Sequence, residues 1–217
     1  MYNFEYISKE EWKPIKDDLI VIIHRLQNEI RDKFTFQYHF VGSSKRKMIT
    51  CDRSSNTGFD FDVNIEVNDP NEDYSPKEIR NIIRKGLDKI INSYECLFWG
   101  YDYTEDSTSV LTIKVKDRTN SRIKYSCDFC IIYECGDGRQ QYIRYNKKQN
   151  SYSWEYRPKG YYALSDKIEW IKQCGLWKQV RDVYLLKKNI NTDNNKKSRS
   201  IFAETIHQVC QQYGYYR

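Results

Sequence analysis

Long apolar runs and histidine are the two things that this sequence most clearly lacks. A membrane-spanning helix needs about 20 consecutive apolar residues, and no stretch of the 217 residues provides them. Met1 leads directly into polar sequence, so we expect no signal peptide. These absences argue against a membrane partner and predict a cytoplasmic location.

The sequence also lacks the ligands of a structural zinc site. Its three histidines are scattered, and Cys127 and Cys130 form a lone C-x-x-C motif. On a strand, residues i and i+3 point to opposite faces, so these two thiols could not hold one ion. The seven cysteines are odd in number and mostly lie in apolar segments, which favours free, buried core thiols in a cytosolic protein.

The composition is that of a folded protein with a positively charged surface. Hydrophobic residues make up 39% of the chain and aromatic residues 15%, enough for a core. The net charge of +6 suits a polyanionic partner such as a nucleoside triphosphate or RNA. Because 30 acidic residues are mixed in, a solvated surface of both signs remains the alternative.

Residues 59–67 predict a strand with one buried face. Apolar residues alternate there with Asp60, Asp62, Asn64 and Glu66. Side chains at i and i+2 share a face about 7 Å apart, so Asp60 and Asp62 can converge on one small space. A divalent cation would relieve their repulsion, although solvated aspartates on an outer strand face are the simpler alternative.

A preceding strand at residues 36–41 runs directly into Gly42 and Ser43. Glycine permits close backbone approach and serine adds a hydroxyl donor, a combination that suits phosphate oxygens. The following loop carries Lys45, Arg46, Lys47 and Arg53, which either are solvated or attract phosphates.

A third carboxylate, Asp128, lies in the most apolar part of a strand predicted at residues 122–134. Burying it without a partner would be costly. Either a salt bridge to a lysine or arginine or a metal ion shared with Asp60 and Asp62 would satisfy it.

The remaining pattern predicts an α+β fold. Capping boxes begin helices at Ser8 and Ser75, and a hairpin joins strands at 110–115 and 122–134. Further helices are expected from Ser165, around Trp177 and from Ser198. A composition shift near Asn146 predicts a core of residues 1–145 and a helical lobe of residues 146–217.

The order of these features resembles the catalytic core of the nucleotidyltransferase superfamily typified by DNA polymerase β, over about Ser8 to Glu134. The long leading helix, with the Lys-rich helix and Ser198-Arg199-Ser200 near the end, looks most like the branch of oligoadenylate synthetases and bacterial cyclic oligonucleotide synthases. The resemblance implies a mixed sheet flanked by helices, with a helical C-terminal lobe.

The resemblance also implies functional residues. It assigns catalysis and the binding of two Mg²⁺ ions, or Mn²⁺, to Asp60, Asp62 and Asp128. Triphosphate binding falls to Gly42 and to Ser43 or Ser44, and we expect Lys188, Arg199 and Ser200 to reach the triphosphate from the helical lobe. A charged helix end is the simpler explanation of Lys188, since the helix dipole favours lysine there.

The implied activity is transfer of a nucleoside monophosphate from a triphosphate to a hydroxyl, with release of pyrophosphate. The acceptor could be a nucleotide, an RNA end, a protein side chain or a small alcohol. Two alternatives remain open: a non-catalytic nucleotide- or RNA-binding module of the same fold, and an unrelated α+β interaction protein. The oligomeric state is not indicated by the sequence.

Overall fold

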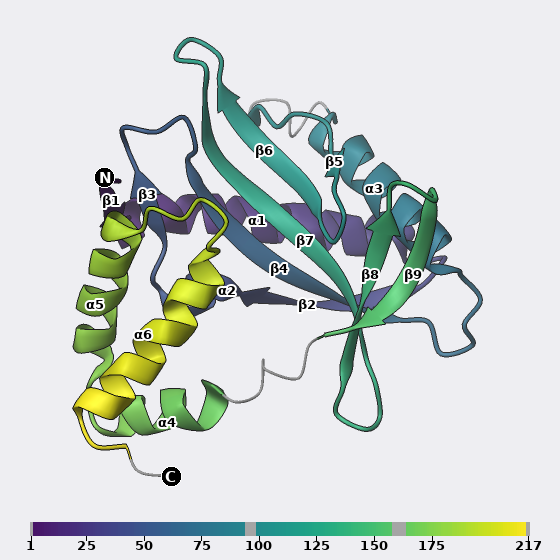
Figure 1. The fold of residues 1–217 in the computed structure, drawn as a ribbon. Helices are drawn as coiled ribbons and strands as arrows, with labels where there is room; N and C mark the ends of the chain where they lie inside the picture. The colour runs from purple at the N-terminus through teal and green to yellow at the C-terminus, as the bar shows by residue number, and fades with distance from the viewer. Residues whose placement is uncertain (1, 94–98, 158–163, 216–217) are drawn as a thin grey trace. The chain divides into compact units, whose positions relative to one another are not determined.

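The computed structural model describes residues 2–93, 99–157 and 164–215, and the chain divides into two compact units (Figure 1). The first unit, unit 1, combines Met1–Tyr6, Asp52–Ser54 and Pro158–Arg217. The second, unit 2, combines Ile7–Cys51 and Ser55–Arg157.

Unit 2 is built on a seven-stranded mixed sheet in the order β2-β4-β7-β6-β5, with β8 pairing with β7 and β9 with β8. Its strands are β2 (Thr35–Val41), β4 (Phe59–Asn68), β5 (Glu105–Asp106), β6 (Leu111–Asp117), β7 (Arg122–Glu134), β8 (Gln140–Asn146) and β9 (Ser151–Tyr156). Strands β4 and β7 are parallel, whereas the other neighbours are antiparallel. The central parallel pair is therefore where the two aspartate-bearing strands meet.

Two helices, α1 (Lys9–Ile30) and α3 (Pro76–Ile91), lie along the same face of this sheet (Figure 1). Both begin as expected: Ser8 accepts a hydrogen bond from the Glu11 amide, and Ser75 forms a capping box with Glu78. The helices pack on the apolar alternate residues of the strands. Fully buried examples are Phe61, Val63, Ile113, Cys127 and Phe129.

Gly86 lies where α3 packs against α1. A Cβ atom at this position would lie 2.6 Å from Leu26 Cδ1 and 3.2 Å from Ile30 Cγ2. The glycine thus permits a closer helix–helix approach than any side chain would.

Unit 1 contains the C-terminal helices α4 (Ser165–Gln173), α5 (Trp177–Ile190) and α6 (Ser198–Gln212), together with β1 (Phe4–Tyr6). Hydrogen bonds fix the N-terminal segment to α5. Phe4 N–H donates to Asn189 Oδ1 at 2.6 Å, Asn189 Nδ2 donates to the Phe4 carbonyl at 3.1 Å, and Tyr6 OH donates to the Arg181 carbonyl at 2.7 Å. No helix in the described ranges has the length and apolar character needed to span a membrane.

The α+β class, the mixed sheet flanked by helices and the helical C-terminal lobe are as predicted. Three details differ. The sequence places residues 146–157 in the helical lobe, whereas β9 extends the sheet there. Gly42–Arg46 form a short helix, α2, and β3 (Thr50–Asp52) lies in the segment expected to be a loop. Elements of three to six residues are too short to show a clear hydrophobic period, which is why the sequence does not reveal them.

Candidate functional site

The sheet face opposite α1 and α3 brings together Asp60 and Asp62 of β4 and Asp128 of β7. In the parallel register, Asp62 lies opposite Asp128 and Asp60 lies opposite Ser126. Paired residues share a sheet face, and neighbouring strands lie about 4.8 Å apart. The carboxylates of Asp62 and Asp128 are therefore direct neighbours, and Asp60 is one step along the same face.

The electrostatics of this face show that its negative charges oppose one another. Burial, followed by repulsion from Asp60 and Asp128, raises the pKa of Asp62 to about 7, and Arg46 opposes that rise. Burial also raises the pKa of Asp128, and the nearby Asp60 adds to the shift. A hydrogen bond from Thr112 and the positive charge of Lys114 counteract the rise at Asp128.

Gly42 approaches this acidic cluster more closely than any other residue type could. It has a φ of +60°, and a Cβ atom built on it would lie 2.0 Å from Asp62 Oδ2. Val41 pairs with Asp62 in the antiparallel register of β2 and β4, so the chain turns into α2 directly beside the carboxylate. The Gly-Ser turn and the Asp-x-Asp strand therefore form one local structure.

The two serines after Gly42 have different surroundings. Ser44 is buried, and its hydroxyl donates to the Val41 carbonyl at 2.9 Å. Ser43 is half-buried, and its carbonyl accepts from the Met48 amide at 2.9 Å. Because the Ser44 hydroxyl is already engaged inside the turn, Ser43 is the better candidate for contact with phosphate.

The chemistry of the donor atoms at the site suits a divalent cation, whereas the positions of the side chains are not those of a formed metal site. As the side chains stand in the described ranges, no three Asp, Glu, His or Cys residues gather closely enough to hold one ion. Asp60 is exposed, and Asp128 Oδ1 is held by Thr112, so the three do not converge. Carboxylate oxygens on adjacent strands are nevertheless the kind of donor that Mg²⁺ prefers, and a bound cation would favour their ionised form.

The triphosphate contacts predicted from the helical lobe belong to unit 1. Lys188 is buried, with its ammonium 3.9 Å from the centroid of the Phe4 ring and 5.9 Å from that of Tyr184. Arg199 and Ser200 are exposed in the first turn of α6. Lys188 thus has a structural role inside unit 1, and contact of all three residues with a triphosphate stays a prediction.

Asp52, another carboxylate in the predicted loop, has local partners in unit 1. Its Oδ2 accepts from the Asn3 amide at 3.3 Å, and its Oδ1 accepts from the amide and hydroxyl of Ser54. These contacts fix a turn at residues 52–54.

Sequence reasoning missed two polar residues of unit 2 on the same face. Thr112 donates to Asp128 Oδ1 at 2.6 Å. Arg157 donates to Asn64 Oδ1 at 3.1 Å and contacts Cys130 Sγ at 3.5 Å, one step along the strands from Asp62 and Asp128. The alternation of β6 indicates that Thr112 faces away from the core, but no local pattern identifies Arg157.

The C-x-x-C motif behaves as the strand argument predicts. Cys127 is fully buried on the core face, whereas Cys130 is half-buried on the opposite face beside Arg157. The interpretation of the C-x-x-C thiols as core residues is therefore correct for Cys127 and wrong for Cys130, and Cys174 is an exposed exception to the expectation of mostly buried thiols. The described cysteines are free thiols.

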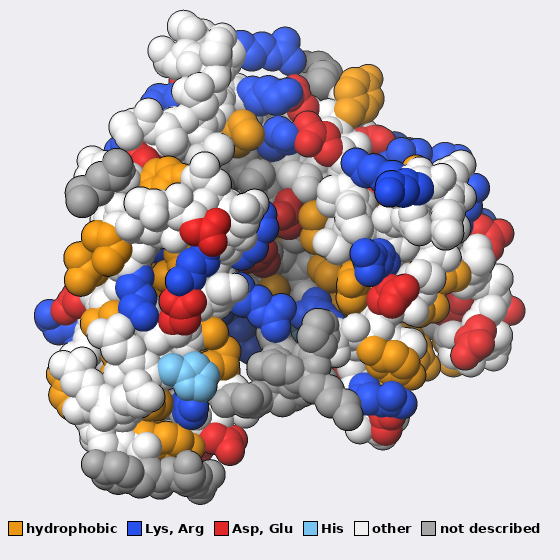
Figure 2. All heavy atoms as spheres, in the orientation of Figure 1, with side chains coloured by type: hydrophobic (Ala, Val, Ile, Leu, Met, Phe, Trp, Pro, Cys, Tyr) orange, Lys and Arg blue, Asp and Glu red, His pale blue; other side chains and the backbone are white. Residues whose placement is uncertain are grey.

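Charged side chains of both signs cover the visible surface. Figure 2 shows Lys and Arg interspersed with Asp and Glu. This mixed pattern means that the net charge of +6 is not gathered into one broad basic area on that view.

No protein-family model matches the sequence, and no curated protein matches it. Solved structures do. The cyclic AMP-GMP synthase DncV of Vibrio cholerae, described as a prokaryotic cGAS homolog, aligns with a TM-score of 0.66 at 11% identity over 93% of this chain and 67% of that one. The CD-NTase CdnG of Bradyrhizobium diazoefficiens, solved in complex with GTP, aligns with a TM-score of 0.59 at 11% identity over 93% and 66%.

A third solved structure, CdnC of E. coli MS115-1 with ATP, aligns with a TM-score of 0.52 at 16% identity over 95% of this chain and 62% of its own. The chain therefore has the nucleotidyltransferase-like fold of these proteins. It spans about two thirds of the length of the solved chains that it matches.

Proposed function

We propose that this protein is a metal-dependent nucleotidyltransferase, which transfers a nucleoside monophosphate from a nucleoside triphosphate to a hydroxyl acceptor and releases pyrophosphate. The observation that carries the proposal is the register of β4 and β7, which sets Asp62 beside Asp128, with Gly42 against the Asp62 carboxylate. The fold shared with CdnG, solved with GTP, and CdnC, solved with ATP, supports the same class of donor substrate.

In this proposal, Asp60, Asp62 and Asp128 would hold two Mg²⁺ ions. Bound there, the ions would lower the pKa of the acceptor hydroxyl and neutralise charge on the triphosphate. Gly42 lets the backbone approach the phosphates, and the Ser43 hydroxyl donates a hydrogen bond to a phosphate oxygen. Arg46, which already acts electrostatically on Asp62, contributes positive charge on the same side.

The transfer needs one proton acceptor. The acceptor oxygen forms a bond to the α-phosphorus while the bond from that phosphorus to the β-phosphate oxygen breaks, which releases pyrophosphate. Asp128 takes the hydroxyl proton, since Thr112 occupies its Oδ1 and leaves Oδ2 to act as the base.

The test is a screen of labelled triphosphates with Mg²⁺ or Mn²⁺, in which pyrophosphate is quantified and products are identified by mass. Asp60→Asn, Asp62→Asn and Asp128→Asn should each abolish pyrophosphate release while the fold is retained. Asp137→Asn, an exposed aspartate on a hairpin of the same unit, is the matched control and should retain turnover.

The outcome also separates the alternatives. Triphosphate binding that depends on a divalent cation, without pyrophosphate release from any donor, would identify a non-catalytic binding module. Absence of divalent-dependent triphosphate binding would contradict both hypotheses. The mass of the product would identify the acceptor class.

A further inference from the structure

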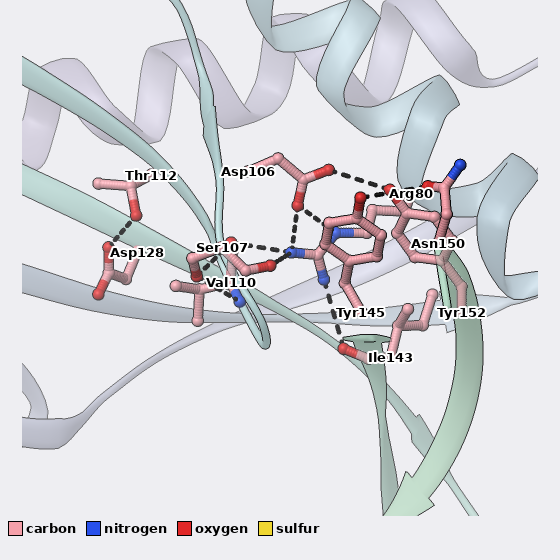
Figure 3. A network of polar contacts seen from close by, with 10 residues as sticks. All are labelled: Arg80, Asp106, Ser107, Val110, Thr112, Asp128, Ile143, Tyr145, Asn150 and Tyr152. Atoms are coloured by element: carbon pink, nitrogen blue, oxygen red, sulfur yellow. Dashed lines mark hydrogen bonds and ion pairs between the residues drawn. The ribbon is translucent and has the colours of Figure 1, made fainter. Parts of the chain in front are cut away.

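We propose that Thr112 is a positioning residue that fixes the orientation of the Asp128 carboxylate at the metal site. The inference rests on the proposed function and extends it to a residue outside the three aspartates. It is carried by the Thr112–Asp128 hydrogen bond, by the register that creates it and by a buried arginine that anchors the adjoining turn (Figure 3).

The first step is the contact itself. Thr112 Oγ1 donates to Asp128 Oδ1 at 2.6 Å, within the short range typical of hydroxyl–carboxylate bonds. Both residues are half-buried and face each other across β6 and β7. The bond commits one carboxylate oxygen to the protein, so the other oxygen has one preferred direction.

The second step is the rigidity of the turn that precedes Thr112. Arg80 of α3 has a side chain that is 1% exposed and donates to the Ser107 carbonyl at 2.6 Å and to the Val110 carbonyl at 2.9 Å. The Ser107 hydroxyl also donates to the Val110 carbonyl at 3.0 Å. The turn that leads into β6 is thus fixed from inside the core, two residues before Thr112.

The charge of Arg80 is itself fully compensated. Its Nε and one terminal nitrogen both donate to Asp106 Oδ1, at 2.8 and 2.6 Å, and the other terminal nitrogen donates to the Ile143 carbonyl at 3.3 Å. Tyr152 OH donates to Asp106 Oδ2 at 3.3 Å. Because a buried, fully bonded arginine is costly to displace, it holds the start of β6 against the sheet.

A purely structural role for the Thr112 hydroxyl would make a different prediction from a positioning role. Valine has almost the same shape as threonine and is favoured in strands, so Thr112→Val should keep the packing of β6 and remove only the hydrogen bond to Asp128. If the hydroxyl orients Asp128, the same substitution should weaken the metal site, because loss of a group that orients a metal ligand typically costs about 10–100-fold in affinity.

The experiment compares wild type, Thr112→Val and Thr112→Ser in the full chain. Mn²⁺ binding is measured by electron paramagnetic resonance without turnover, and pyrophosphate release and thermal unfolding are measured in parallel. We expect Thr112→Val to weaken Mn²⁺ binding about tenfold and to lower kcat with little change in KM for the triphosphate. Thr112→Ser keeps the hydroxyl and should restore both.

Thr35→Val is the matched control, since Thr35 lies on β2 of the same sheet, at the end remote from Asp62. It should leave Mn²⁺ binding unchanged. Asp128→Asn is the reference for a lost ligand. If Asp128→Asn weakens Mn²⁺ binding but Thr112→Val does not, or if Thr112→Ser is as impaired as Thr112→Val, the positioning role is overturned and the proposed function stands. If Asp128→Asn binds Mn²⁺ as wild type does, both are overturned.

Discussion

Gly42 is the residue of the site at which a larger side chain is most clearly excluded. Its φ of +60° and the 2.0 Å that would separate a Cβ atom at this position from Asp62 Oδ2 leave no room for a methyl group. We expect Gly42→Ala to displace the Asp62 carboxylate and to lower turnover by roughly 100-fold, the cost of an approximately 1 Å misplacement of a catalytic group. Steady-state pyrophosphate release measures this effect.

Gly138→Ala provides the control for backbone strain. Gly138 also has a positive φ, +77°, but nothing lies within 4 Å of a Cβ atom built there. Both substitutions carry the penalty of an alanine in the left-handed region, about 1–2 kcal/mol. Equal loss of turnover in the two variants would contradict a specific role for Gly42 beside Asp62.

Asp62 should make the stability of the metal-free protein depend on pH. Its folded-state pKa is about 7, whereas an unfolded aspartate has a pKa of about 3.9. Ionisation therefore favours the unfolded chain, and the free energy of unfolding should fall as pH rises from about 4 to about 7, by on the order of 2–4 kcal/mol. Asp62→Asn should flatten this decline in urea unfolding with a chelator present.

Asp117 provides a control of opposite sign. Hydrogen bonds from Asn120, together with the guanidinium of Arg122, lower the pKa of Asp117 below its usual value. Its ionised form therefore stabilises the fold above the unfolded pKa, so Asp117→Asn should reduce stability at neutral pH. Because the pKa of Asp128 is also raised, some decline should remain in Asp62→Asn, but a decline as steep as that of the wild type would show that Asp62 is not its source.

At the level of secondary structure, the β6–β7 hairpin shows where sequence reasoning stops. The turn at residues 117–120 predicts the hairpin, and Asp117 pairs with Arg122 next to it. If the residues of β6 and β7 paired one to one from that point, Leu111 would lie opposite Asp128. A bulge between Val115 and Lys116 shifts the register by one residue and brings Thr112 there instead. A one-residue shift exchanges the faces of a strand, and no single residue in the sequence marks where it occurs.

The long strands could be predicted from their alternation of apolar and polar residues, and the same alternation places two of the site residues. Ten residues of β4 alternate strictly, and that parity alone puts Asp60 and Asp62 on one face. The pairing of β4 with β7 depends instead on contacts between residues more than 60 positions apart. Ile143 lies 63 positions from its partner Arg80, and Asn64 lies 93 positions from its partner Arg157, so only the folded chain reveals these contacts.

The packing of α1 against α3 gives a prediction at this level. Gly86→Ala gains about 1 kcal/mol of helix propensity, but the new methyl would lie 2.6 Å from Leu26 Cδ1. Overpacking costs typically about 1–3 kcal/mol, so we expect net destabilisation of about 1 kcal/mol in chemical unfolding. Combination with Leu26→Val, which removes the Cδ atoms, should cost less than the sum of the single changes. Strict additivity would mean that Leu26 is not the obstacle.

For the whole molecule, the two units carry different parts of the proposed site. The three aspartates and the Gly-Ser turn belong to unit 2, whereas Lys188, Arg199 and Ser200 belong to unit 1. Because all three aspartates belong to unit 2, that unit could bind metal without unit 1.

Arg199→Gln and Lys188→Met distinguish substrate binding from structural support in unit 1. If the exposed Arg199 contacts the triphosphate, Arg199→Gln should raise the Kd for a non-hydrolysable triphosphate about tenfold without lowering the melting temperature. Hydrogen bonds to charged groups contribute about 1.5–3 kcal/mol, which is the basis of this estimate.

Lys188→Met should lower the melting temperature, because it removes the cation held against the Phe4 ring at 3.9 Å. Lys178→Gln, an exposed lysine of the same unit, controls for net charge. Calorimetric binding at two salt concentrations measures the effect, and equal affinities in Arg199→Gln and Lys178→Gln would exclude a triphosphate contact by Arg199.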